Sequence, residues 1–123
     1  MKEVRVDDAP SPIGPYSQAI VHGDLVFCSG QLGLDPSTGK LKEGAVEQTR
    51  QALTNLEAVL RGAGSSLRHA LKVTIYLTDL SCFPQMNDVY ANFFVPPYPA
   101  RTAIQVSALP KGAMVEIDVI AER

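Results

Sequence analysis

The sequence predicts an α+β fold in which one sheet carries helices on one of its faces. Segments of alternating apolar and polar residues recur along the 123-residue chain, and this alternation is typical of half-buried strands. Between them lie two segments in which apolar residues recur at spacings of three and four, as on one face of a helix. Helices that are mixed with hairpins in this way pack as a layer on a sheet.

The first predicted elements are strands. Valine alternates with charged residues at positions 4–6, which indicates a short strand, and the prolines and glycine of residues 10–15 then impose an irregular segment. Residues 18–21 and 25–29 follow as two further strands. The Gly-containing turn at 22–24 joins them, so we expect a hairpin.

A loop and the clearest helix come next. Residues 30–44 carry glycine and proline at short intervals and predict a loop. Residues 46–61 predict a helix, because their apolar positions fall on one face and most of the charged and amide side chains fall elsewhere. Gly62 and Gly64 are suited to end this helix in a left-handed conformation. The predicted core-facing residues are Val46, Thr49, Leu53, Leu56 and Leu60.

The second half of the chain predicts another strand and another helix. Residues 71–78 alternate strictly, so that one face carries only apolar side chains. Ser81 is a suitable N-cap for the helix, with Pro84 tolerated in its first turn, and Pro96-Pro97 would stop it. The apolar face of the strand consists of Leu71, Val73, Ile75 and Leu77.

Two strands end the chain. Residues 102–107 and 114–121 are the predicted strands, and the connection at 108–113 is short and contains proline and glycine. We therefore expect these strands to pair with each other in antiparallel fashion. No internal repeat or change of composition divides the chain, so residues 1–123 are expected to form a single domain.

Composition narrows the classes of function. The formal net charge is −2, from 11 basic and 13 acidic residues, and no cluster of cations offers a surface for phosphates, which makes nucleic acid an unfavourable partner. No apolar stretch is long enough to span a bilayer. Two cysteines are too few for a disulfide framework or a zinc site. The first ten residues resemble no targeting segment, so a cytoplasmic protein with free thiols is expected.

Two residues are candidates for acid–base and anion chemistry. Arg101 follows the rigid segment Pro96-Pro97-Tyr98-Pro99, so its guanidinium could be fixed for two parallel hydrogen bonds to a carboxylate. Glu116 interrupts an apolar strand, and a half-buried carboxyl there would favour its neutral form and suit proton transfer. Taken alone, each is more often a surface residue of a strand.

Other polar residues are weaker candidates. Tyr16 follows a rigid Gly-Pro turn, and Ser29-Gly30-Gln31 ends a strand where glycine would let a ligand approach the backbone. Asn87 lies on the second predicted helix and is more often solvent-facing than a ligand contact. His22 and His69 are expected to be exposed. The chain has no nucleophile elbow, P-loop or dinucleotide motif.

Several short motifs, in this order and spacing, are similar to those of the YjgF/RidA family over essentially the whole chain. The motifs are Ile13-Gly14-Pro15-Tyr16-Ser17-Gln18-Ala19, Ser29-Gly30-Gln31, Asn87-Asp88-Val89-Tyr90, Pro99-Ala100-Arg101 and Leu109-Pro110-Lys111-Gly112-Ala113-Met114-Val115-Glu116-Ile117. The resemblance implies a chorismate-mutase-like α+β fold, with a mostly antiparallel mixed sheet and two helices on one face. It also implies a homotrimer with a central barrel and a cleft between each pair of subunits.

The same resemblance implies a 2-iminobutanoate/2-iminopropanoate deaminase. Such an enzyme hydrolyses reactive 2-enamino and 2-imino acids, such as the 2-aminoacrylate that PLP-dependent enzymes release, to 2-keto acids and ammonia. No metal or organic cofactor is expected. By this resemblance Arg101 grips the substrate carboxylate and Glu116 positions the attacking water. Tyr16 and Ser29 line the cleft, and Gly30 offers a backbone contact.

One departure from the family pattern concerns the residues after Arg101. Many members have Ser and then Cys there, whereas this chain has Thr102 and Ala103, which removes any catalytic role for a thiol at that point. Two other functions compete with the deaminase: a 2-keto acid sensor without turnover, and RNA cleavage or translation inhibition, against which the acidic balance argues. A chorismate mutase activity would rest on the fold alone.

Overall fold

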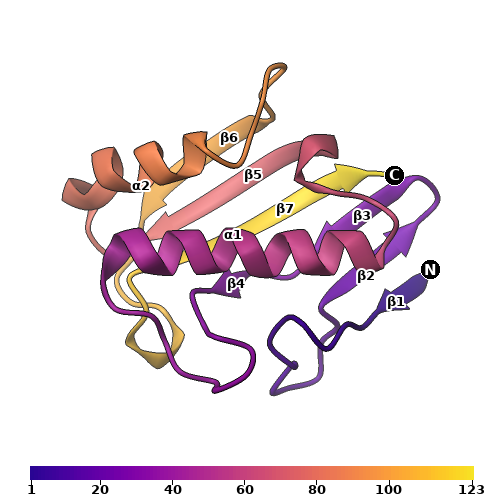
Figure 1. Cartoon of the computed structure of the whole chain (residues 1–123), viewed down its shortest axis with the longest axis horizontal. Coiled ribbons are helices and arrows are strands. Elements are labelled where there is room, and N and C mark those ends of the chain that lie inside the picture. The colour runs from indigo at the N-terminus through magenta and orange to yellow at the C-terminus, as the bar shows by residue number, and fades with distance from the viewer.

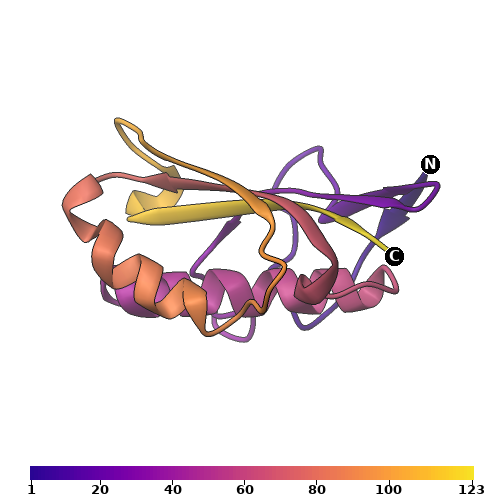
Figure 2. The same cartoon turned by 90° about the horizontal axis from the view of Figure 1, so that it is seen from above.

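The computed structural model describes all residues, 1–123, as one sheet with two helices on the same face (Figure 1). Seen along the sheet, both helices lie on one side, and no helix covers the other side (Figure 2). The α+β prediction with a helical layer on one face is therefore confirmed. The elements are β1 (Lys2–Val4), β2 (Ala19–His22), β3 (Leu25–Cys28), β4 (Gln31–Leu32), α1 (Gly44–Gly62), β5 (Ala70–Leu77), α2 (Phe83–Ala91), β6 (Ala100–Gln105) and β7 (Val115–Glu122).

The sheet is mixed, in the order β1-β2-β3-β7-β5-β6, and β4 pairs with β7 beyond the end of β3. β7 runs antiparallel to β3, β4 and β5, whereas β6 runs parallel to β5 at the edge. β2 and β3 form the predicted hairpin, and the first strand lies slightly earlier than predicted. The expected loop at 30–44 contains the short strand β4, which two residues of alternation are too few to reveal.

The prediction that the last two strands pair with each other is wrong, because β5 lies between them. After β5 the chain crosses over through α2, and such a crossover returns the next strand parallel to the first, at the sheet edge. Residues 106–114 then carry the chain past β5 into the gap between β3 and β5. There β7 pairs with β3 on one side and with β5 on the other.

The second helix also starts differently from its prediction. Ser81 is not its N-cap; it lies in a 3-10 turn, Leu80–Cys82, and its backbone N–H donates to the Asp79 carboxylate at 2.9 Å. α2 begins at Phe83, with Pro84 in its first turn as predicted. The apolar periodicity continues to Phe94, beyond the helix end, because that ring stacks on Tyr90 of the last turn at 4.4 Å between centroids.

Two smaller predictions fail, one because of a close contact and the other because of a register shift. Gly62 belongs to α1 and is not its cap; a Cβ there would lie 2.3 Å from a methyl carbon of Val6, whereas Gly64 takes the left-handed conformation with φ of 79°. Leu71 is 42% exposed because the pairing of β5 with β7 shifts register between Ala70 and Lys72, which turns its side chain away from the core.

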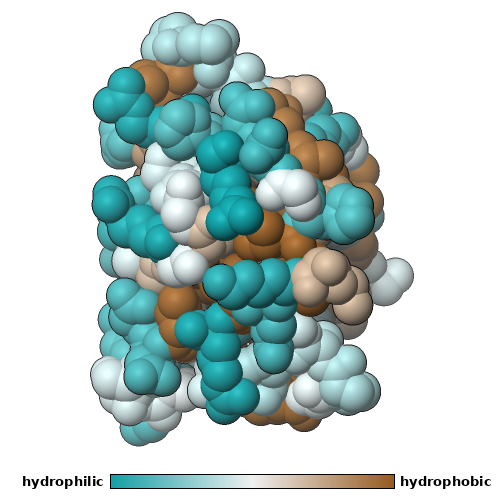
Figure 3. Space-filling view, turned by 90° about the vertical axis from the view of Figure 1, so that its right-hand side faces the viewer, coloured by the Kyte–Doolittle hydropathy of each residue, from teal (hydrophilic) through white to brown (hydrophobic).

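The core lies between the sheet and the helices. The predicted residues Thr49, Leu53, Leu56 and Leu60 of α1 are buried, and α1 packs over β7 and α2. Figure 3 views the right-hand end of Figure 1, where apolar side chains reach the surface between hydrophilic ones. On the sheet face without helices, Phe27 and Ile104 are 43% and 41% exposed. Neither helix is long and apolar enough to cross a membrane.

Candidate active site

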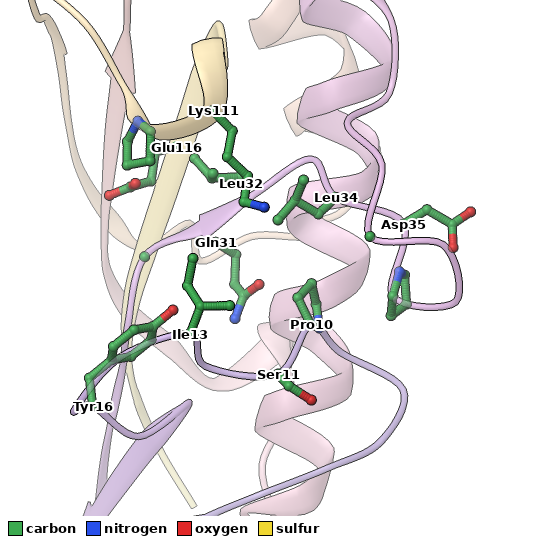
Figure 4. Close-up of a pocket in the computed structure, with 14 residues that line it drawn as sticks. Pro10, Ser11, Ile13, Tyr16, Gln31, Leu32, Leu34, Asp35, Lys111 and Glu116 are labelled. Carbon is green, nitrogen blue, oxygen red and sulfur yellow. The ribbon is translucent and has the colours of Figure 1, made fainter.

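A cavity of about 450 Å³ opens where three segments meet: residues 10–16, β4 with the loop after it, and the 3-10 turn before β7 (Figure 4). Its volume falls in the range of small-molecule sites. The lining includes two carboxyls, a phenol, an amide, an ammonium group and several apolar side chains. The lining residues are Pro10, Ser11, Ile13, Tyr16, Gly30, Gln31, Leu32, Leu34, Asp35, Pro36, Gly39, Pro110, Lys111 and Glu116.

Glu116 enters this cavity from β7. Its neighbours Val115 and Ile117 are fully buried in the core, so the alternation of the strand turns Glu116 to the face without helices, where it is half-buried. Gly30 lies directly against it: a Cβ on Gly30 would come within 2.4 Å of Glu116 Oε2. Only glycine leaves room for the carboxyl in this position, which gives Gly30 a role that its place at a strand end did not reveal.

The surroundings raise the pKa of Glu116 above its ordinary value. Burial is the largest cause, because it disfavours the charged form, and the nearby Asp118 carboxylate adds like-charge repulsion. Asp118 in turn accepts a hydrogen bond from the Tyr76 hydroxyl at 2.9 Å. Glu116 therefore holds its proton more tightly than an exposed glutamate, as proton transfer near neutral pH requires.

Tyr16 forms part of the opposite wall. The residue is 50% exposed, and its backbone N–H donates to the carbonyl of Gly14 at 2.9 Å, which fixes the tight turn. Gln18 is buried and anchors the same segment: its Nε2 donates to the carbonyl of Pro10 at 2.9 Å, and its Oε1 accepts from the N–H of Val6 at 2.7 Å. The sequence predicted Tyr16 as a candidate but did not indicate this anchor.

Ser29 lies next to the cavity but is not among its lining residues. Its hydroxyl donates to the carbonyl of Ser17 at 2.6 Å, so the proton is engaged in holding β3 to the segment before β2. Asp35 lines the loop side of the cavity and forms an ion pair with Lys42 at 3.5 Å. The two cysteines are free, and burial raises the pKa of Cys28 to about 12, which makes that thiol unreactive.

Arg101 lies elsewhere on the chain. It is inside β6, not before it, and it pairs with the buried Val73, which puts it on the helical side of the sheet edge. Its guanidinium donates to Asn87 Oδ1 at 2.7 Å and lies over the rings of Tyr90 and Phe83, at 4.8 and 5.3 Å from their centroids. Asn87, which we expected to face solvent, is half-buried and fixes this arginine.

The structure thus brings Tyr16, Gly30 and Glu116 together and leaves Arg101 apart from them. Arg101 and Glu116 do not lie on neighbouring strands, since β5 separates them, and within one chain they point to opposite faces of the sheet. A site that used both would need a second chain. The exposed position of His22 and His69 is as predicted.

Lys111 is the clearest lining residue that sequence reasoning missed. It is exposed and has a φ of 60°, in the left-handed region that residues other than glycine seldom adopt. The signals in the sequence were its place between Pro110 and Gly112 and its position inside the motif of residues 109–117. The residues that stand where relatives have Ser and Cys lie outside the cavity: Thr102 accepts a hydrogen bond from Lys72 Nζ at 2.9 Å, and Ala103 is partly buried.

Comparisons with known proteins match almost the whole of this chain. A family model described as Endoribonuclease L-PSP matches residues 6–123. The RutC family protein y4sK of Sinorhizobium fredii is 51% identical over 98% of this chain and 96% of its own length. A protein of Bos taurus named 2-iminobutanoate/2-iminopropanoate deaminase is 46% identical over 98% of this chain and 88% of its own.

Solved structures agree over the full length. RidA from the Antarctic bacterium Psychrobacter is 45% identical, with a TM-score of 0.98 and complete coverage of both chains. TdcF of E. coli, solved with bound serine, is 38% identical with a TM-score of 0.95, covering 100% of this chain and 99% of its own. The chain therefore belongs to the YjgF/RidA family.

Proposed function

We propose that this protein hydrolyses small 2-imino acids to 2-keto acids and ammonia, with Glu116 as the acid–base group and Arg101 as the carboxylate anchor. The observation that carries the proposal is a half-buried glutamate of raised pKa, held against Gly30 in a cavity of ligand size. The name of the Bos taurus relative, which is 46% identical to this chain, supports the same reaction.

The reaction consumes one water and releases one ammonia. The water oxygen bonds to the imine carbon while one of its protons moves to the imine nitrogen, which gives a carbinolamine. The hydroxyl proton of the carbinolamine then moves to that nitrogen by way of Glu116, the carbon–nitrogen bond breaks to release ammonia, and the carbinolamine oxygen becomes the keto group. An enamine such as 2-aminoacrylate enters after it tautomerises to the imine.

Glu116 suits both proton transfers. As a carboxylate it can accept a proton from the attacking water, and as the acid it can return one to the departing nitrogen. Its raised pKa brings the two forms closer in free energy at neutral pH than they are in an exposed glutamate. Gly30 supports this role by leaving space beside the carboxyl, and Tyr16 contributes its phenol to the wall of the cavity. Ser29 lies beside the cavity with its proton engaged by the Ser17 carbonyl, so it can offer a ligand only its hydroxyl oxygen as an acceptor.

Arg101 suits the substrate carboxylate, because Asn87 and two aromatic rings already fix its guanidinium. A guanidinium that is already fixed loses little conformational entropy when it binds a carboxylate through two hydrogen bonds. Since Arg101 and Glu116 face opposite sides of one chain, we propose that the site forms between subunits of a homotrimer with a central barrel. The apolar side chains left exposed on the sheet face without helices, Phe27 and Ile104 among them, support such an assembly.

The setting we propose is the cytoplasm, where PLP-dependent enzymes release reactive enamines and where the free thiols of this chain would stay reduced. The role would then be removal of these intermediates. Binding of small amino or keto acids is in keeping with the serine bound to TdcF, which is 38% identical to this chain.

The test generates 2-aminoacrylate in place with a dehydratase and follows its loss with and without this protein. We expect faster loss with the native protein and none beyond the uncatalysed rate with Arg101→Ala or Glu116→Gln. A variant as active as the native protein would refute the role of that residue. Tight keto-acid binding without any acceleration would instead establish a sensor.

RNA cleavage is the second candidate, because the matching family model is described as an endoribonuclease. The net charge of −2 offers little attraction for phosphates. Cleavage that survives Arg101→Ala and repeated purification, and that falls steeply with salt, would favour this activity over the deaminase.

A further inference from the structure

Two carboxyls lie next to each other on the sheet face that no helix covers (Figure 2). Glu116 and Asp118 are two positions apart on β7, so the alternation of the strand turns both toward this face, where both are half-buried. On β5, Tyr76 is the direct cross-strand partner of Glu116, and Thr74 is that of Asp118. The Tyr76 hydroxyl nevertheless donates to Asp118 Oδ2, at 2.9 Å. One phenol therefore lies beside both carboxyls and hydrogen-bonds to only one of them.

No cation neutralises this carboxyl pair, because the ion pairs of the chain all join other residues. The titratable groups on the elements packed around the pair are Tyr16, Cys28, Asp35, Lys72 and Lys111. Of the two lysines, Lys72 donates to the Thr102 hydroxyl at 2.9 Å, and Lys111 is exposed. Two carboxylates that lack a cation repel each other, so the pair keeps one proton to a higher pH than either carboxyl would alone.

The two carboxyls differ in their hydrogen-bond donors. Asp118 has the Tyr76 hydroxyl, whose pKa is raised by burial, so that it stays protonated and continues to donate. Glu116 has no donor within the chain, and burial and the Asp118 charge both raise its pKa. A donor favours the ionised form of the carboxyl that accepts it, by about fivefold in population. The single proton of the pair is therefore expected on Glu116.

We propose that Tyr76 assigns the single proton of this carboxyl pair to Glu116 by holding Asp118 as the carboxylate, which makes Tyr76 and Asp118 positioning residues for imine hydrolysis. The inference rests on the proposed deaminase function and adds two residues that act through Glu116. While Asp118 is held ionised, its charge keeps the proton on Glu116 up to a higher pH. Without the phenol, Asp118 takes the proton part of the time, so Glu116 is ionised from a lower pH onward.

The first experiment locates the proton directly. The side-chain carboxyl carbons of glutamate and aspartate are labelled with carbon-13, and NMR follows them through a pH titration, with Glu116→Gln and Asp118→Asn to assign the signals. In the native protein the upper titration step should appear almost entirely at Glu116. In Tyr76→Phe the share of that step that appears at Asp118 should rise about fivefold. Thr74→Val is the matched control: it removes the hydroxyl directly opposite Asp118, which donates to neither carboxyl, and it should leave the native shares unchanged.

The second experiment tests whether this assignment matters for the reaction. Tyr76→Phe should make the rising limb of the kcat–pH profile for 2-iminopropanoate shallower and move its midpoint about half a pH unit lower. The same change made in the Asp118→Asn protein should move the limb no further, because Tyr76 acts through Asp118. A tyrosine that only packs against the sheet would change neither the limb nor the carbon titration.

The outcomes separate this inference from the function on which it rests. If Tyr76→Phe leaves the share of Asp118 unchanged, or moves the limb as far in the Asp118→Asn protein as in the native one, the inference is overturned and the deaminase stands. If the native protein hydrolyses no imine faster than the uncatalysed rate, the deaminase fails and the carbon titration alone decides the inference. A rise at Asp118 would then support the assignment of the proton, and no rise would overturn it.

Discussion

Replacing Gly30 by alanine should displace the carboxyl of Glu116 with little effect on the fold. The new Cβ would lie 2.4 Å from Glu116 Oε2 and 2.8 Å from its carboxyl carbon, whereas ordinary contacts begin near 3.4 Å. The carboxyl oxygen must therefore move by about 1 Å, from 2.4 to 3.4 Å. A misplacement of about 1 Å can cost a catalytic group on the order of 100-fold in rate. We expect a loss of that size in kcat/KM for imine hydrolysis.

Stability should hardly change, because the displaced atoms are the far end of a half-exposed side chain. The free energy of unfolding in urea should stay within about 0.5 kcal/mol of the native value. Gly14→Ala is the matched control: a Cβ there meets only the Tyr16 ring at 3.6 Å, an ordinary contact, so activity should be retained. If Gly30→Ala folds normally and hydrolyses imines at the native rate, the position of Glu116 does not govern catalysis.

Three further predictions concern the pKa of Glu116, the fixation of Arg101 and the packing of the core. Asp118→Asn removes a negative charge beside Glu116, so the pKa of Glu116 should fall. Because the Glu116 carboxylate is the proposed base, the rising limb of the kcat–pH profile should move to lower pH. Titration of the Glu116 carboxyl followed by carbon NMR checks the pKa directly. Asn87→Ala frees the Arg101 guanidinium, which should raise KM for imines several-fold more than it lowers kcat. Gly33→Ala would put a Cβ 2.4 Å from a backbone atom of α1, and urea unfolding should report a loss of about 1–3 kcal/mol.

The local elements of the fold could be predicted because each follows from its own stretch of sequence. Helix α1 and strand β5 lie within two residues of their predicted bounds, since apolar periodicity and glycine mark them directly. Which strands pair could not be predicted in the same way. β7 could have paired with β6, but it enters the sheet between β3 and β5. That choice depends on where the α2 crossover leaves β6 and on the unpaired edges of β3 and β5, and the alternation of residues within β7 carries no information about it.

The site was predictable only in pieces. Glu116 could be identified as half-buried from its two apolar neighbours, and its raised pKa agrees with that reasoning. The closeness of Gly30 to its carboxyl is a contact across 86 positions of the chain, which spacing alone cannot reveal. The sequence does not single out Asn87 or Lys111, because amides and lysines are common on protein surfaces. In the folded chain Asn87 accepts a hydrogen bond from Arg101, and Lys111 lines the cavity.

The separation of Arg101 from Glu116 within one chain leads to a last prediction. If each site takes Arg101 from one subunit of a cyclic trimer and Glu116 from the next, two inactive variants should complement each other. A junction is intact only where a Glu116→Gln chain supplies the arginine and an Arg101→Ala chain supplies the glutamate, which random mixing produces at about a quarter of the junctions.

Unfolding Arg101→Ala and Glu116→Gln together in equal amounts and refolding them should therefore restore about a quarter of native activity. Each variant refolded alone is the control and should stay inactive, and ultracentrifugation of the mixture should report three chains per particle. A mixture that assembles but remains inactive would mean that one chain must supply both groups. Either a rearrangement of β6 would then have to bring Arg101 to the face that carries Glu116, or the anchor role would pass to another cation, of which Lys111 is the one already at the cavity.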